Sequence, residues 1–143
     1  MLLFWRYVYS HFVDKIKYIK NASRDDKENL FIILLVATLF CGNQLIKNKI
    51  NIPYLGYFLK NHHNDFLGGV SFMSVINVIL SFSKYNKINN LTTILFIGLM
   101  CSVFWEVVTP IYLTRSTGDF YDAIAYCAGF LVYWLVKNIK DCK

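Results

Sequence analysis

Four long apolar stretches occupy most of this chain, and they constrain its fold more than any other feature. They cover residues 30–46, 65–82, 91–110 and 119–136. Each is close to the roughly 17–25 residues that a helix needs to cross a bilayer. The connections between them are short, which favours antiparallel neighbours in compact packing. The sequence therefore predicts an all-α fold, an integral membrane four-helix bundle over residues 30–137.

Composition supports a membrane location. Of the 143 residues, 56% are hydrophobic and 17% are charged, against roughly 25% charged in an ordinary soluble domain. The formal net charge of +6 would suggest nucleic acid as a partner in a soluble protein. Here the basic residues flank apolar stretches, as membrane insertion requires. We therefore expect the lipid bilayer as a partner and no nucleic acid.

The segments outside the four stretches are more polar. Residues 1–20 intersperse apolar side chains with basic ones, which predicts an amphipathic helix at the membrane surface. Residues 21–29 form a charged linker, in which Ser23 and Asp26 predict a capping box for the next helix. Residues 138–143 are expected to form a cytoplasmic tail.

The distribution of basic residues predicts the orientation. Eleven lysines and arginines lie in the N-terminal segment, the second connection and the tail, against four in the first and third connections. Basic residues accumulate on the cytoplasmic side of membrane proteins. The sequence therefore predicts that both termini are cytoplasmic.

Ionisable side chains in or beside the apolar stretches are informative because a charge at mid-bilayer costs about 3 kcal/mol on insertion scales. In the predicted orientation such residues gather toward the outer ends of the stretches, whereas the inner half offers little beyond Asn77. This one-sided distribution predicts an outward-facing acidic pocket. Its candidate ligand-binding residues are Glu106, Asp119, Asp122, Arg115, Asp65 and His62.

Helical spacing predicts how these residues meet. In the fourth stretch, polar and small residues recur at steps of three and four and share one helix face; they are Asp119, Asp122, Tyr126, Gly129 and Tyr133. In the third stretch, Gly98, Ser102 and Glu106 do the same at steps of four. Small residues let helix backbones approach closely. Packing the two faces together would bring Glu106 toward Asp119 and Asp122.

A structural interpretation of the aspartates stays open beside this one. Asp65, Asp119 and Asp122 lie in predicted first turns, where a carboxylate caps the helix and complements its dipole. Glu106 does not fit that account, because it precedes a helix end where the dipole disfavours an anion. We therefore expect Glu106 to be protonated, paired with Arg115 or bound to a cation.

The cluster also predicts a cofactor class. Oxygen ligands from Glu106, Asp119 and Asp122 suit a divalent cation such as Mg²⁺ or Ca²⁺, and a histidine ligand would shift the preference toward Zn²⁺ or Mn²⁺. A non-enzymatic or accessory role is favoured, and no catalytic residue is assigned. Two alternatives stay open: a membrane hydrolase or transferase that acts on an envelope lipid, and a small transporter or proton relay.

Two segments resemble the VanZ-like family of small bacterial integral membrane proteins, which is named for a teicoplanin-resistance accessory protein. They are Phe104-Trp-Glu106-Val-Val and Gly118-Asp119-Phe-Tyr-Asp122-Ala-Ile-Ala-Tyr126-Cys-Ala-Gly129. Residues Glu106, Arg115, Asp119, Asp122 and Gly129 match the family pattern. The resemblance implies the bacterial plasma (inner) membrane, an envelope lipid or cell-wall precursor as ligand, and an accessory role in envelope homeostasis or glycopeptide-antibiotic resistance.

Overall fold

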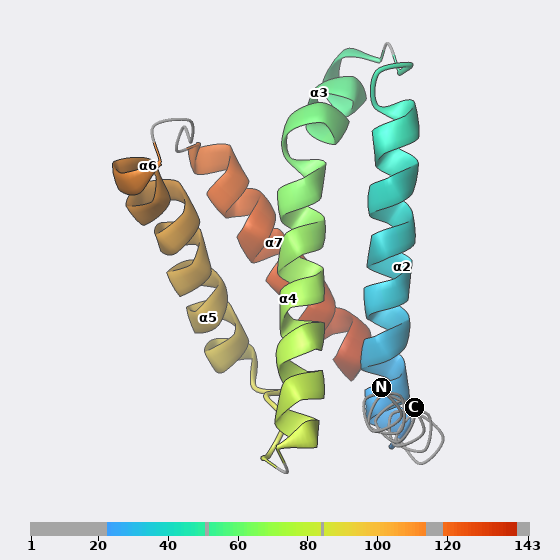
Figure 1. Ribbon diagram of the computed structural model, residues 1–143, viewed down its shortest axis with the longest axis vertical. Coiled ribbons are helices and arrows are strands. Elements are labelled where there is room, and N and C mark those ends of the chain that lie inside the picture. The colour runs from blue at the N-terminus through green and yellow to red at the C-terminus, as the bar shows by residue number, and fades with distance from the viewer. Residues whose placement is uncertain (1–22, 51, 84, 114–118, 140–143) are drawn as a thin grey trace, which may run out of the picture.

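The computed structural model describes residues 23–50, 52–83, 85–113 and 119–139. The surface helix predicted over residues 1–20 and the candidate residue Arg115 lie outside these ranges. Within them, every regular element is helical, which confirms the all-α prediction (Figure 1). The elements are α2 (Arg24–Ile46), α3 (Pro53–Asn61), α4 (His63–Phe82), α5 (Leu91–Val103), the π-helical turn η1 (Phe104–Val108), α6 (Thr109–Tyr112) and α7 (Phe120–Asn138).

Three helical segments are long and apolar enough to cross a membrane: Arg24–Ile46, His63–Phe82 and Leu91–Tyr112, the last comprising α5, η1 and α6. Helix α7, with 19 residues, is not among them. The three segments agree closely with the first three predicted apolar stretches. The described part of the chain is therefore compatible with a multi-pass membrane protein.

Local sequence explains where two of the helices begin. Ser23 caps α2: its side chain accepts a hydrogen bond from the Asp26 N–H, and the Asp26 side chain accepts one from the Ser23 N–H. The predicted capping box is thus confirmed, and α2 begins at Arg24. Asp119 caps α7 by accepting a hydrogen bond from the Tyr121 N–H at 2.9 Å. Both caps satisfy backbone N–H groups that a helix leaves without internal partners.

The first connection contains a helix that the sequence analysis missed. Helix α3 lies within it and begins at Pro53. Proline suits the first turn of a helix because the missing N–H would have no partner there. His62 ends α3 and also precedes α4. Helix α3 therefore fixes the position of a candidate ligand.

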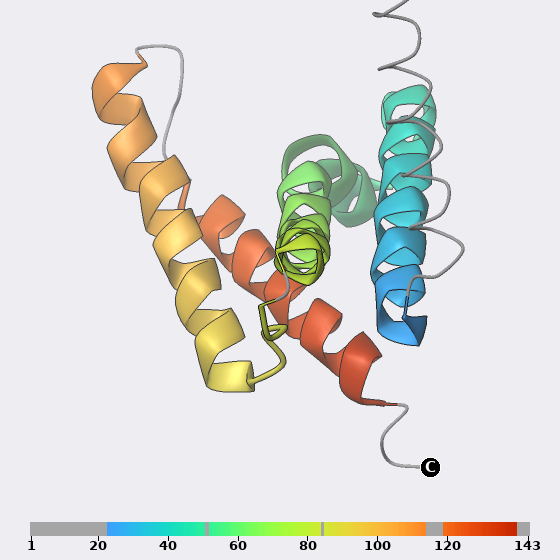
Figure 2. The same ribbon diagram turned by 60° about the horizontal axis from the view of Figure 1, so that its bottom comes forward.

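Helix α7 crosses the other helices diagonally. In Figure 1 it begins beside α6, passes behind α4 and ends next to the start of α2, and Figure 2 shows the same crossing. The closest approach joins α4 and α7, where a Cβ on Gly69 would lie 2.5 Å from the Tyr126 carbonyl oxygen and one on Gly129 would lie 3.1 Å from the Gly69 Cα. Only glycine permits this approach.

Helix α5 contacts a different face of α7. A Cβ on Gly98 would lie 2.9 Å from the Phe130 ring, so this ring fills the space above Gly98. The small residues of α5 therefore face α7, as expected. The expectation that Gly129 meets α5 is wrong, because the face of α7 that carries Gly129 packs against α4. Met73, Ile94 and Phe130, which are almost completely buried, form the core between these three helices.

Candidate functional site

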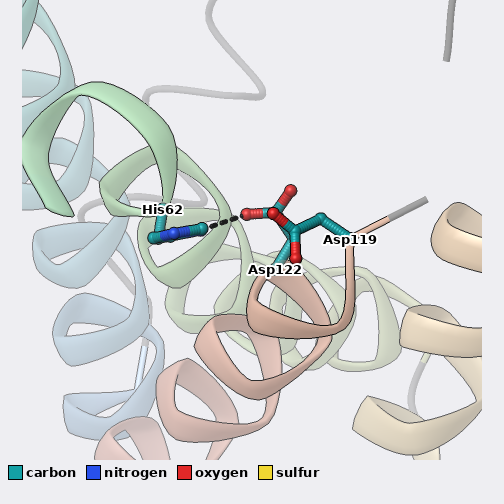
Figure 3. A group of neighbouring side chains, drawn as sticks. All are labelled: His62, Asp119 and Asp122. Atoms are coloured by element: carbon teal, nitrogen blue, oxygen red, sulfur yellow. Dashed lines mark hydrogen bonds and ion pairs between the residues drawn. The ribbon is translucent and has the colours of Figure 1, made fainter. Parts of the chain in front are cut away.

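A short polar contact at one end of the fold joins His62 to Asp122. The two atoms, His62 Nδ1 and Asp122 Oδ1, are 2.5 Å apart, and His62 is 6% exposed (Figure 3). The rings of Tyr57 and Tyr121 pack near the imidazole, with centroids 5.2 and 5.9 Å away. The pair thus joins the α3–α4 junction to the first turn of α7. We call this region, with Asp65, Glu106 and Asp119, the carboxylate end.

His62, Asp119 and Asp122 together form a group that can hold a metal ion. Each offers one ligand atom, and the three atoms all lie within 4.8 Å of one another. Figure 3 shows both carboxylates at the start of α7 on the side toward the imidazole. The Nε2 atom of His62 is buried and has no hydrogen-bond partner. One nitrogen and two carboxylate oxygens suit Zn²⁺ or Mn²⁺ better than Mg²⁺ or Ca²⁺.

Glu106 reaches the same cluster from η1. Its Oε2 atom accepts a hydrogen bond from the Asp119 N–H at 2.7 Å. The anion therefore lies against the N-terminus of α7, where the helix dipole favours negative charge. This partner was not among the expected ones, because the sequence analysis considered only the helix that carries Glu106.

The π-helical turn η1 lies just before Pro110. Pro110 has no N–H to donate to the Glu106 carbonyl four residues earlier. The Thr109 N–H instead bonds to the Phe104 carbonyl, which the Thr109 hydroxyl also contacts at 2.9 Å. Such turns occur frequently at functional sites. Here the turn contains the one acidic residue of this helical segment.

Asp65 completes the cluster from α4. Its side chain interacts with Tyr126 and Asp122, and it lies close enough to Glu106 for electrostatic repulsion. The Tyr126 ring lies over Gly68, where a Cβ would be 3.2 Å from the ring. The structure thus brings together Asp65, Glu106, Asp119, Asp122 and His62. Tyr126 joins the candidates as a residue that the sequence analysis placed only on the shared face of α7.

A buried asparagine lies near the α3–α4 junction. Asn43 of α2 is 3% exposed, and its Nδ2 donates to the Leu59 carbonyl at 2.8 Å. It also lies 3.4 Å from the Asn64 side chain. Its Oδ1 atom is buried without a hydrogen-bond partner. Asn43 therefore ties α2 to the segment that positions His62.

The opposite end of the fold contains a second polar network. The Tyr133 hydroxyl donates to Asn29 Oδ1 at 2.9 Å and accepts from Asn77 Nδ2 at 2.7 Å. Asn77 also bonds to the N–H and carbonyl of Ile88, at 2.8 and 3.0 Å. All three side chains are at most 1% exposed. The expectation that this half offers little beyond Asn77 is therefore wrong.

Lysines neutralise the acids around this network. Lys87 pairs with Asp25 at 2.8 Å and also with Asp26, while Lys137 pairs with Asp25 and with Glu28. Burial disfavours the charged form of Lys87, but hydrogen bonds and attraction from the two aspartates outweigh it and raise the pKa of Lys87. We call this region the lysine end.

Comparisons with known proteins add no assignment. No protein-family model, no curated protein and no solved structure matches this chain. The candidate site therefore depends on its own geometry: four carboxylates and one buried histidine that converge from the α3–α4 junction, α4, η1 and α7.

Proposed function

We propose that this chain is a multi-pass protein of the bacterial plasma membrane whose outward-facing carboxylate end binds a cation. In this proposal α7 is the fourth crossing of a four-helix bundle, and residues 1–20 form a surface helix. The contacts of α7 support the fourth crossing. Its first turn contacts His62 at the carboxylate end, and Lys137 near its last turn contacts Asp25 at the lysine end. Helix α7 therefore extends between the same two ends as its neighbours.

The proposed orientation has two supports. The start of α2 and the end of α7 meet at the lysine end through Asp25 and Lys137, so they lie on one side of any membrane that the helices cross. Basic residues also predominate in the segments of this side, including Lys87 in the second connection. Cytoplasmic termini would then place the carboxylate end outside.

One observation carries the proposed function: the carboxylate end holds uncompensated negative charge. Among the described residues, no lysine or arginine pairs with Asp65, Glu106, Asp119 or Asp122, and His62 is their one basic partner. Partly buried anions without counter-charges are costly. A bound cation would remove this cost. The geometry supports a divalent ion held by His62, Asp119 and Asp122.

Such an ion would link the protein to the envelope. A divalent cation that keeps open coordination positions can also bind a phosphate oxygen. A lipid phosphate or cell-wall precursor is therefore a suitable ligand for the loaded site. The VanZ-like resemblance of the segments around Glu106 and Asp122 agrees with an accessory role in envelope homeostasis or glycopeptide-antibiotic resistance.

Isothermal titration in detergent tests the metal site. We expect the wild-type protein to bind Mn²⁺ or Zn²⁺ more tightly than Mg²⁺ or Ca²⁺. The Asp122→Asn variant should lose at least about tenfold in affinity, because even outer-shell partners of metal ligands contribute 10–100-fold. Asp141→Asn makes the same change in the tail and serves as the matched control. No binding by the wild type, or equal affinity in all three proteins, would contradict the proposal.

One observation favours the enzymatic alternative. A buried imidazole held by a carboxylate, as in the His62–Asp122 pair, is an arrangement that can activate water or a hydroxyl group. An envelope-lipid hydrolase or transferase would then use His62 as the base. Loss of envelope-lipid turnover in His62→Gln cells, with protein level and metal affinity unchanged, would favour this function over cation binding.

No comparable observation favours transport. A relay between the two ends needs polar groups at the level where α4 and α7 cross. At that level Gly69 and Gly129 bring the two backbones into contact, and Met73 and Phe130 are fully buried beside them. Uptake by liposomes that contain the purified protein would overturn this argument.

A further inference from the structure

The described residues leave an apolar groove between α5 and α7. Its walls include Val103 and Val107 on one side and Phe120 and Ile124 on the other, and its volume is about 500 Å³. Ligand pockets in proteins typically measure about 300–1,000 Å³. The wall residues are exposed, and Phe120 is 76% exposed. In a membrane these walls would face lipid.

The length of the groove matches one leaflet. Its α5–η1 wall extends from Leu99 to Val107, eight residues apart. At 1.5 Å per residue this is roughly 12 Å. The hydrocarbon core of a bilayer is about 30 Å thick, so one leaflet contributes about half of that. An alkyl chain of the leaflet next to the carboxylate end therefore fits along the groove.

The polar end of the groove determines the head group. Glu106 and Asp119 line this end, and none of the described residues that line the groove is basic. The groove between α2 and α7, of about 730 Å³, has the opposite excess of charge, because three basic residues and one acid, Glu28, line it: Arg24, Lys27 and Lys137 are the basic ones. Charge complementarity thus favours a cationic head at the first groove and an anionic head at the second.

We propose that the groove between α5 and α7 holds the alkyl chain of an amphiphile whose protonated amine head binds the carboxylates of Glu106 and Asp119. The inference rests on the proposed cation-binding function of the carboxylate end and specifies the chemical class of the ligand. Because Asp119 belongs to both the groove and the metal group, a divalent ion and the amine head compete for it.

Photo-crosslinking tests this proposal. The protein in phosphatidylcholine nanodiscs is irradiated with hexadecylamine or hexadecanoic acid, each carrying the same diazirine at mid-chain, and the labelled residues are mapped by mass spectrometry. We expect the amine to label both walls of the groove, at Val103 and Ile124, several-fold more than the acid does. Excess Mn²⁺ should reduce labelling by the amine. The basic groove provides the internal reference, where the acid should label more.

Two variants separate the possible failures. Glu106→Gln combined with Asp119→Asn should reduce labelling by the amine to the level of the acid. Asp122→Asn, which does not line the groove, should keep selective labelling while losing Mn²⁺ affinity in the titration. Labelling without Mn²⁺ binding would refute the metal site and leave this inference standing. Equal labelling by amine and acid, as for an ordinary membrane lipid, or labelling by neither, would overturn it.

Discussion

The carboxylate end and the lysine end both gather acidic side chains at the extremities of the same helices, yet their charges are balanced differently. At the lysine end, Lys87 and Lys137 contact Asp25 directly. At the carboxylate end, the described residues offer His62 alone, and it contacts Asp122. At the lysine end the protein's own lysines balance the negative charge of the acids. At the carboxylate end an external cation could balance it. Similar numbers of acids can therefore stabilise a fold or form a binding site.

The two ends differ in charge balance more than in how their buried polar groups are satisfied. The network of Asn29, Asn77 and Tyr133 links α2, α4 and α7 through short hydrogen bonds. Each end nevertheless has buried side-chain atoms without a hydrogen-bond partner: Asn29 Nδ2 at the lysine end, and His62 Nε2 and Asn43 Oδ1 near the carboxylate end. Unsatisfied buried groups reduce stability. Because such atoms occur at both ends, the missing counter-charge is what distinguishes the carboxylate end.

Replacing Lys137 should have the largest effect on stability. The Lys137 side chain is 9% exposed, and Lys137→Met leaves Asp25 and Glu28 with less positive charge. Breaking a buried pair from one side typically costs about 3–5 kcal/mol. We expect a loss near the lower value, because the Asp25 side chain is 36% exposed. Reversible unfolding in mixed micelles would measure it.

Two variants check the origin of that loss. Lys60→Met removes an exposed lysine of α3 and should leave the free energy of unfolding nearly unchanged. Adding Asp25→Asn to Lys137→Met should restore part of the stability, because Asp25 then no longer carries a negative charge that Lys87 alone contacts. A double variant less stable than Lys137→Met alone would show that charge compensation is not the cause.

A divalent cation should stabilise the carboxylate end. Because a ligand that binds only the folded state stabilises it by mass action, Mn²⁺ at 100 times its Kd should add about 2.7 kcal/mol. The thermal midpoint of the wild type should rise accordingly, and that of Asp122→Asn should not. Lys137→Met should keep the full rise, since its defect lies at the other end. An equal rise in the wild type and Asp122→Asn would mean that the ion binds elsewhere.

Tyr133→Phe should produce the next largest loss. The variant removes the hydroxyl that accepts from Asn77 and donates to Asn29, and leaving buried polar groups unsatisfied costs about 1–3 kcal/mol. Tyr126→Phe is the matched control, seven residues earlier on the same face of α7. Tyr126 is only partly buried, so the loss should be at most about 1 kcal/mol. Equal losses of stability in Tyr133→Phe and Tyr126→Phe would contradict the view that the hydroxyl at the lysine end contributes more.

The sequence predicted the apolar helices well because their burial in lipid depends on long runs of similar residues. It missed α3, a short helix of nine residues. The signals that could have revealed it are Pro53 and the apolar residues that follow. The sequence analysis placed His62 in the same predicted pocket as Asp122, but without α3, which positions His62, it did not specify that the two side chains are in direct contact.

The convergence of the acids was predictable in part. The spacing of Asp119, Asp122, Gly129 and Tyr133 showed that they share a face, since helical geometry fixes this locally. Which helix meets that face depends on the contact of Gly69 with Gly129, a property of the assembled fold. The partner of Glu106 depends likewise on where α7 begins. Local periodicity contains neither piece of information.

High pH should have the smallest of these effects on stability, and it should act at the lysine end. The aspartates raise the pKa of Lys87 in the folded protein above the ordinary value of about 10.4. A raised folded pKa means that the ion pairs contribute their full stability below about pH 10 and lose it as the pH rises through the folded pKa. The Lys87–Asp25 pair is partly exposed, and pairs of this kind contribute about 1 kcal/mol or less.

The effect of Lys87 can be isolated from other groups that titrate at high pH. Tyrosines and the remaining lysines lose protons in the same range, but they do so equally in the wild type and in Lys87→Met. The stability difference between these two proteins should therefore be constant from pH 7 to 10 and shrink above that range. A difference that stays constant to pH 12 would show that Lys87 contributes through packing of its aliphatic stem and not through its charge. Mn²⁺ cannot substitute for the lost lysine charge at the lysine end, because the group of metal-ligating atoms lies at the opposite end of the helices.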